Sequence, residues 1–191
     1  MLPLFPLDTV LFPGCRLDLQ IFEPRYLDMI SGCLRRDQGF GVVAILEGRE
    51  VGAAPDRLAS VGCEARVVDW QQRPNGLLGI RVEGARRFAV RTLQVADNQA
   101  VSAEVEWLSE PADQPAGVEH AELQALLAAL IEHPLVVDLG LDEPVSGRQL
   151  LADRLAYLLP LERAQKLELL AELDASRRLQ QIAEWVALLQ E

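Results

Sequence analysis

The stretch from Leu17 to Asp37 constrains the fold most, because a predicted strand runs directly into a predicted helix there. In the segment LDLQIF, apolar and polar residues alternate with the period of two of a half-buried strand. Pro24 ends this strand, since proline has no amide hydrogen and its φ suits the first turn of a helix. Apolar residues then recur at helical spacing as far as Leu34. The orientation of the strand therefore fixes that of the helix.

Residues 1–112 otherwise consist of short strand patterns separated by turn signals such as Pro13-Gly14 and Asn75-Gly76. The two prolines of residues 2–7 suit an edge strand, because proline donates nothing to a central ladder. Short strands, tight turns and one early helix predict a closed or nearly closed antiparallel β-barrel.

Residues 113–191 have the apolar period of helices instead. A proline-containing hinge precedes them, and the pattern predicts four helices in a small bundle. Ser146 and Gln149 form a predicted capping box, and Asp174 is predicted to cap the last helix, whose buried face includes Leu189. The predicted fold class is therefore α+β, with a barrel domain at 1–112 and a helical bundle at 113–191.

The net charge of −11 limits the function. Residues 1–112 carry 12 basic and 15 acidic residues, and residues 113–191 carry 6 basic and 14 acidic ones. An acidic surface repels phosphate backbones, which argues against general nucleic-acid binding. The N-terminus lacks a basic signal region, no apolar run is long enough to span a bilayer, and three dispersed cysteines fit a reducing compartment. We therefore expect a cytoplasmic protein with no membrane association.

The lysine, histidines and cysteines of the sequence do not form a recognisable catalytic motif. Lys166 is the only lysine and follows Gln165, so a GxxxxGK[ST] phosphate loop is excluded. His120 and His133 lie near opposite ends of one predicted helix, roughly 20 Å apart at the standard rise, too far to share a metal ion. Cys33 and Cys63 fall on apolar faces, whereas Cys15 follows a turn and is expected to be more exposed. We expect no catalytic residue, no metal and no cofactor.

The candidate binding residues with the clearest rationale are Glu23, Arg25 and Tyr26, at the strand–helix junction. One interpretation makes the charged pair a binding site beside an aromatic surface. The alternative is structural: Glu23 accepts amide hydrogen bonds at the helix N-terminus and Arg25 fixes a neighbouring loop.

Arg86 and Arg87 are candidates for extending this site as a basic strip, with Trp70 adding an apolar contact. The alternatives are a solvated pair of arginines at a strand start and a tryptophan that contributes edge-on to the core.

The segments IFEPRY, EVG, VGCEAR, GARRF and RLAYLLP occur in an order that resembles the N-terminal substrate-recognition domain of Lon proteases, also found in small stand-alone proteins. The resemblance implies a PUA-like β-barrel followed by a helical bundle, and a role in recognising unfolded or tagged substrates. It also implies no ATPase or protease domain within these 191 residues. The matching positions are glycines, prolines and core apolar residues for the most part, so they indicate a fold more than a binding chemistry.

We therefore predict a non-catalytic module that binds unfolded or partly folded polypeptides. An extended apolar peptide is expected in a groove between barrel and bundle or along an open barrel strand. A full-length protease is a candidate partner, and self-association is compatible with the sequence. The alternative is an RNA-binding module, since RNA binders share the barrel class and residues 1–112 carry twelve arginines.

Overall fold

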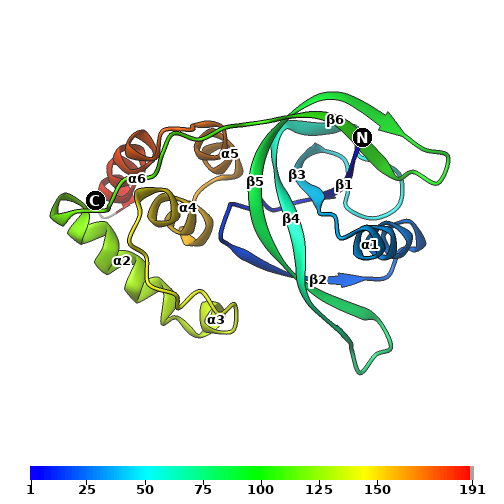
Figure 1. Ribbon diagram of the computed structural model, residues 1–191, viewed down its shortest axis with the longest axis horizontal. Helices are drawn as coiled ribbons and strands as arrows, with labels where there is room; N and C mark the ends of the chain where they lie inside the picture. Colours follow the sequence, from blue (N-terminus) through cyan, green and yellow to red (C-terminus); the bar gives the residue numbers. More distant parts are fainter. Residues whose placement is uncertain (190–191) are drawn as a thin grey trace. The chain divides into compact units, whose positions relative to one another are not determined.

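The computed structural model describes residues 1–189 and divides the chain into two compact units. The first unit spans Met1–Leu108 and the second begins at Ser109. Unit 1 holds the strands and one helix, and unit 2 holds the remaining helices (Figure 1).

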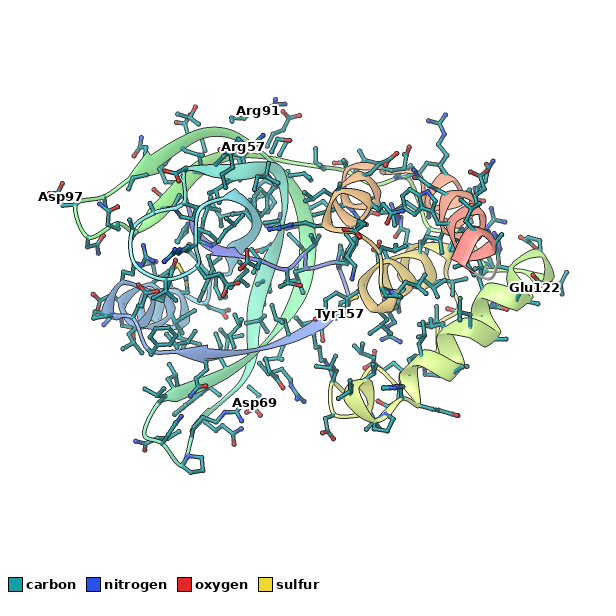
Figure 2. The ribbon with its side chains drawn as sticks, turned by 180° about the vertical axis from the view of Figure 1, so that it is seen from behind. Arg57, Asp69, Arg91, Asp97, Glu122 and Tyr157 are labelled. Atoms are coloured by element: carbon teal, nitrogen blue, oxygen red, sulfur yellow. The ribbon has the colours of Figure 1, made fainter. Side chains whose placement is uncertain are left out.

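In unit 1, two strands precede the early helix and four strands follow it. The elements are β1 (Leu2–Leu7), β2 (Arg16–Ile21), α1 (Pro24–Arg36), β3 (Phe40–Glu47), β4 (Arg57–Gln72), β5 (Leu78–Val95) and β6 (Val101–Trp107). Helix α1 begins at Pro24, where the sequence places it, and only two residues separate it from the end of β2. The long β4–β5 hairpin extends beyond the rest of unit 1 (Figures 1 and 2), and Asp69 marks it in Figure 2.

The strands form one six-stranded mixed sheet in the order β2-β5-β4-β3-β1-β6, with a further pairing between β5 and β6. The predicted antiparallel barrel is therefore wrong in two respects. Strands β1 and β3 pair in parallel, and β2 pairs with β5 alone, outside the ring of pairings that returns from β6 to β5. The eighteen-residue β5 makes this possible, because it is long enough to pair with β2, β4 and β6.

The prediction that β1 is an edge strand is also wrong. Its residues 2–4 pair with β6 and its residues 4–7 pair with β3. Pro3 pairs only with β6 and Pro6 pairs only with β3, so each proline has a partner strand on one side only. Offset pairing therefore lets a proline-containing strand enter the interior of a sheet.

The core of unit 1 is aromatic and aliphatic. Phe12, Phe40 and Phe88 are completely buried, and Ile30 and Cys33 of α1 face the same interior. Gly84 permits a close approach of the turn after β1, because its N–H donates to Cys15 O at 2.9 Å and its carbonyl accepts from Gly14 N at 2.8 Å. Cys15 is buried, contrary to prediction, because these bonds fold its turn against β5.

Unit 2 contains a short 3₁₀ turn and five helices within the described residues. They are η1 (Val118–His120), α2 (Ala121–Ile131), α3 (Pro134–Val137), α4 (Arg148–Leu158), α5 (Arg163–Ala171) and α6 (Ala175–Leu189). Helix α4 is central and contacts α2, α5 and α6. Its leucines pack with those of α5 and α6, and Leu151, Leu155 and Leu169 are fully buried.

The helix caps differ in part from the predicted ones. Asp174 accepts from Ser176 N at 2.8 Å ahead of α6, as predicted. The predicted capping box at Ser146 and Gln149 is wrong, since α4 begins after Gly147 with no side-chain cap. A capping box occurs instead at Glu162 and Gln165 of α5. The side chain of Leu189, assigned to the buried face of the last helix, lies outside the described part of the chain.

Candidate functional site

The junction between β2 and α1 is organised around Arg25, a buried side chain at the start of the helix. Its Nη1 donates to Gln99 O at 2.7 Å and its Nη2 donates to Glu50 O at 3.4 Å. The same Nη2 pairs with Glu23 Oε2 at 3.1 Å. Arg25 thus joins the β3–β4 loop and the β5–β6 loop to the first turn of α1.

Glu23 holds a loop rather than capping the helix. Its carboxylate accepts from Gly52 N at 3.4 Å and makes no cap hydrogen bond to α1, so the predicted capping role is wrong. The structural interpretation of Arg25, by contrast, agrees with its contacts to two loop carbonyls. Glu23 and Arg25 therefore fix the shape of the surface around them.

Tyr26 belongs to the core. Its ring stacks on Phe5 with centroids 4.1 Å apart and planes 8° apart, and the Arg25 guanidinium lies 4.6 Å above it. Burial raises the pKa of the Tyr26 hydroxyl, which stays neutral at physiological pH. The expected aromatic surface is therefore not supplied by Tyr26, which is 4% exposed.

A pocket of about 160 Å³, named here the junction pocket, opens beside these residues. Phe22 and Val51 at its rim are 51% and 55% exposed. The described residues that line it include three carboxylates and no basic side chain. The full set of residues that line the junction pocket is Phe5, Leu7, Asp18, Leu19, Gln20, Ile21, Phe22, Glu23, Tyr26, Glu50 and Val51. The junction pocket is thus an apolar hollow in an acidic surround.

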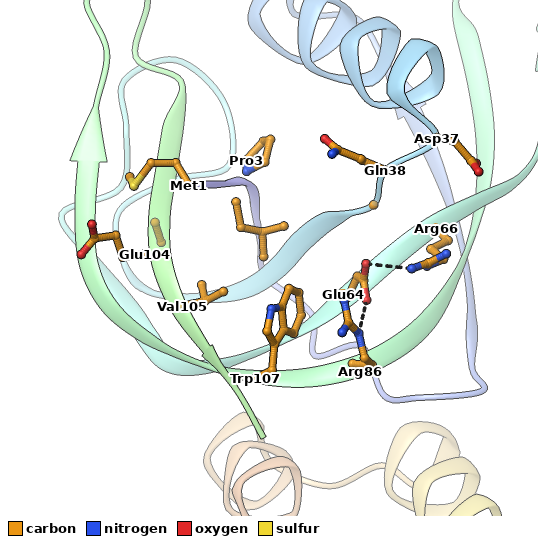
Figure 3. A pocket seen from close by; sticks show the side chains of 13 residues that line it. Met1, Pro3, Asp37, Gln38, Glu64, Arg66, Arg86, Glu104, Val105 and Trp107 are labelled. Atoms are coloured by element: carbon orange, nitrogen blue, oxygen red, sulfur yellow. Dashed lines mark hydrogen bonds and ion pairs between the residues drawn. The ribbon is translucent and has the colours of Figure 1, made fainter. Parts of the chain in front are cut away.

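A second pocket of about 480 Å³, named here the Trp107 pocket, is polar (Figure 3). The buried Glu64 carboxylate pairs with Arg86 Nε at 2.8 Å and with Arg66 Nη2 at 3.4 Å. The Arg86 guanidinium lies 3.9 Å over the Trp107 ring. Met1, Gln38 and Glu104 are among the other residues that line it. One buried carboxylate thereby holds two arginines that remain about half exposed.

A β-bulge explains how Arg86 meets Glu64. Cys63 pairs with Arg87 and Ala65 pairs with Gly84, so one residue of β4 opposes two of β5 between them. Such a bulge redirects a side chain. Sequence reasoning missed Glu64 and Trp107, because no local pattern reveals the bulge or the partner of Arg86.

The remaining predicted residues do not join one site. Arg87 is 1% exposed, because consecutive strand residues point to opposite faces, so the predicted basic strip with Arg86 is wrong. Trp70 is 63% exposed on the β4–β5 hairpin and lines neither pocket. The six candidates thus divide among a structural cluster at the junction, the Trp107 pocket, the core and the hairpin.

The described residues hold no group of three side chains suited to a metal ion. All three cysteines are buried, and burial raises the pKa of the Cys33 thiol. None of the helices within residues 1–189 has the length and apolar character needed to cross a bilayer.

Unit 1 is a mixed α+β unit with two surface pockets, and a helical unit follows it in sequence. The family model of the ATP-dependent protease La (LON) substrate-binding domain matches residues 1–187, and the chain belongs to this family. The resemblance seen in the sequence is confirmed. Membership supports a role in substrate recognition.

Individual relatives agree with this assignment. The chain is 31% identical over 195 residues to Lon protease 4 of Sorangium cellulosum, covering 95% of this chain but only 23% of that protein. The crystal structure of a Lon N-terminal domain protein from Xanthomonas campestris is 38% identical with a TM-score of 0.78, covering 96% of this chain and 97% of that one. The N-terminal domain of a Mycobacterium avium complex Lon protease, 22% identical with a TM-score of 0.68 and 97% coverage of both chains, shares the fold.

Proposed function

We propose that this protein is a non-catalytic module that binds unfolded or partly folded polypeptides in the cytoplasm. The junction pocket is the observation that carries the proposal. Its rim exposes Phe22 and Val51, and Arg25 holds the adjoining loops in place through two backbone carbonyls. A preformed apolar hollow binds an apolar side chain without the cost of ordering its own walls.

The proposal places peptide binding in residues 1–112 and assigns residues 113–191 to a supporting helical domain. Family membership supports polypeptide substrates as the ligand class. We further propose an adaptor role in protein quality control, with a full-length ATP-dependent protease as partner. RNA is not proposed as the ligand, because the net charge of −11 opposes a phosphate backbone.

Fluorescence anisotropy with a labelled, chemically unfolded protein tests the proposal, with the same protein in its native form as the competitor control. We expect the unfolded form to bind and the native form to compete weakly. Phe22→Ala should weaken binding about fivefold or more, since it removes an exposed aromatic wall of the junction pocket.

Val95→Ala is the control, because Val95 is exposed to a similar extent, 55% against 51% for Phe22, and lines neither pocket. Trp70→Ala tests the hairpin in the same titration. Equal binding of unfolded and native protein, or equal loss in Phe22→Ala and Val95→Ala, would refute a specific site at the junction. Peptide hydrolysis by the purified protein would refute the non-catalytic assignment.

A further inference from the structure

Strand β2 presents a backbone edge that no other described strand occupies. Within residues 1–189 it pairs with β5 alone, in an unbroken antiparallel register from Arg16 opposite Glu83 to Ile21 opposite Leu78. Figure 1 shows β2 passing directly into α1 at this margin of the sheet. An unoccupied strand edge is a template for pairing with another chain.

The register shows which amides point outward. Cys15 O accepts from Gly84 N at 2.9 Å, one step before the Arg16–Glu83 pair in the same register. In an antiparallel ladder the backbone groups of alternate residues face the partner, so Leu17, Leu19 and Ile21 face β5. By the same alternation, Asp18 and Gln20 direct their N–H groups away from β5.

Two hollows meet along this edge. The junction pocket and a second hollow of about 460 Å³ share the segment Asp18, Leu19 and Gln20. Arg73, Pro74 and Asn75 of the β4–β5 turn form the other wall of the second hollow. An added strand points successive side chains to opposite faces, so two adjoining hollows suit the alternate side chains of one extended segment.

The charges around the junction pocket select the occupant. Three carboxylates, from Asp18, Glu23 and Glu50, stand at its walls. Glu23 is paired with Arg25 at 3.1 Å, and Asp18 is paired with Arg81 at 2.7 Å. No basic side chain lines the pocket among the described residues, so an acidic segment is repelled there.

We propose that the outer edge of β2 binds an extended segment of a partner polypeptide as an added strand, with an apolar side chain in the junction pocket and a lysine or arginine beside it. This inference rests on the proposed function and names the ligand chemistry of the same surface. Backbone pairing supplies affinity that is independent of sequence, while the acidic surround favours basic and apolar segments over acidic ones.

Gln20→Pro tests the backbone contact, because proline lacks the outward amide and is tolerated at a strand edge. Gln20→Ala is the matched control, since it removes the same side chain and keeps the amide. The probe is a fluorescent synthetic peptide that alternates valine and threonine and carries two lysines, together with a version in which both lysines are glutamate.

We expect Gln20→Pro to bind the lysine peptide about three- to tenfold more weakly. This is the effect expected from the loss of one backbone hydrogen bond and the weakening of the next one along the strand. Gln20→Ala should bind within about twofold of the unmodified protein. The glutamate peptide should bind at least about fivefold more weakly than the lysine peptide at low salt, and the difference should shrink as salt increases. Equal affinity of the two Gln20 variants overturns the strand-addition assignment.

Hydrogen exchange of the unmodified protein keeps the test independent of how Gln20→Pro folds. The amides of Asp18 and Gln20 should gain protection when the lysine peptide is added, and unchanged exchange at both overturns the proposal. If the protein binds unfolded polypeptide but the Gln20 variants and these amides do not respond, the edge assignment fails while the proposed function stands. If it binds no unfolded polypeptide, the proposed function fails. Self-association that Gln20→Pro abolishes would make a second copy the occupant, which also overturns the proposal.

Discussion

Replacing Gly84 by alanine tests how tightly the turn after β1 is held against β5. An added Cβ would lie 2.1 Å from the carbonyl oxygen of Phe12 and 3.1 Å from Cys63 Sγ. The first of these atoms is backbone, so relief requires the turn to move away from β5. That movement breaks the two hydrogen bonds that Gly84 makes with Gly14 and Cys15.

The expected cost follows from these contacts. Two buried hydrogen bonds contribute about 1 kcal/mol each, and overpacking in a dense core costs about 1–3 kcal/mol. We therefore expect Gly84→Ala to lower the free energy of unfolding by about 3–5 kcal/mol. A domain with a typical free energy of unfolding, about 5–15 kcal/mol, would lose a large part of it.

Gly32→Ala is the control, because Gly32 lies inside α1 and its added Cβ would meet only the flexible end of Arg36, at 3.2 Å. Alanine in a helix interior should leave stability unchanged or raise it by up to about 1 kcal/mol. Urea unfolding followed by hydrogen exchange and mass spectrometry would assign the change to residues 1–108. A Gly84→Ala variant within about 1 kcal/mol of the unmodified protein would refute the close-packed turn, because one lost hydrogen bond alone accounts for that much.

Three further predictions concern buried and paired groups. The Arg81 hydrogen bond lowers the pKa of the Asp18 carboxyl. The Asp18–Arg81 pair therefore stabilises the folded protein above the unfolded-state pKa near 3.9, and this stabilisation is lost as pH falls through the lower pKa of the folded state. Asp18→Asn should therefore cost at most about 1 kcal/mol at pH 7, and urea titrations should show no difference from the unmodified protein at pH 2. Arg178→Met removes a fully buried guanidinium that pairs with buried Asp153 at 3.4 Å. Thermal unfolding should show that the helical unit loses about 3–5 kcal/mol of stability. A loss under about 1 kcal/mol would contradict a buried ion pair. All three thiols are buried, so a thiol-reactive dye should label none in the native protein and three after unfolding, and rapid labelling of the native protein would contradict the packing.

The local features of the fold were predictable where one residue type decides the backbone. Pro24 begins a helix because its ring presets φ, and the alternating residues of β2 form a half-buried strand. The sequence could not predict that β1 and β3 pair in parallel, since alternation reports which face is buried and not which strand is the neighbour. Pro3 and Pro6 wrongly suggested an edge strand. The two partner strands of β1 pair with different parts of it, so each proline has a neighbouring strand on one side only.

The candidate site was predictable only at the junction, where its residues are adjacent in sequence. The partners of Arg25 lie at Glu50 and Gln99, and nothing in the local sequence links those loops. Arg86 meets Glu64 at a bulge, which changes the register by one residue without a sequence signature. Long-range register, rather than residue identity, thus determines which candidates meet.

The pairing of β1 has a consequence for synthesis on the ribosome. Leu2–Leu4 of β1 are synthesised well before Val101–Ala103 of β6, the residues with which they pair. At roughly 5–20 residues per second, the interval lasts roughly 5–20 s. During that time the apolar segment Leu2–Leu7 lacks its β6 partner, so a chaperone near the exit tunnel should engage this segment and release it as β6 arrives.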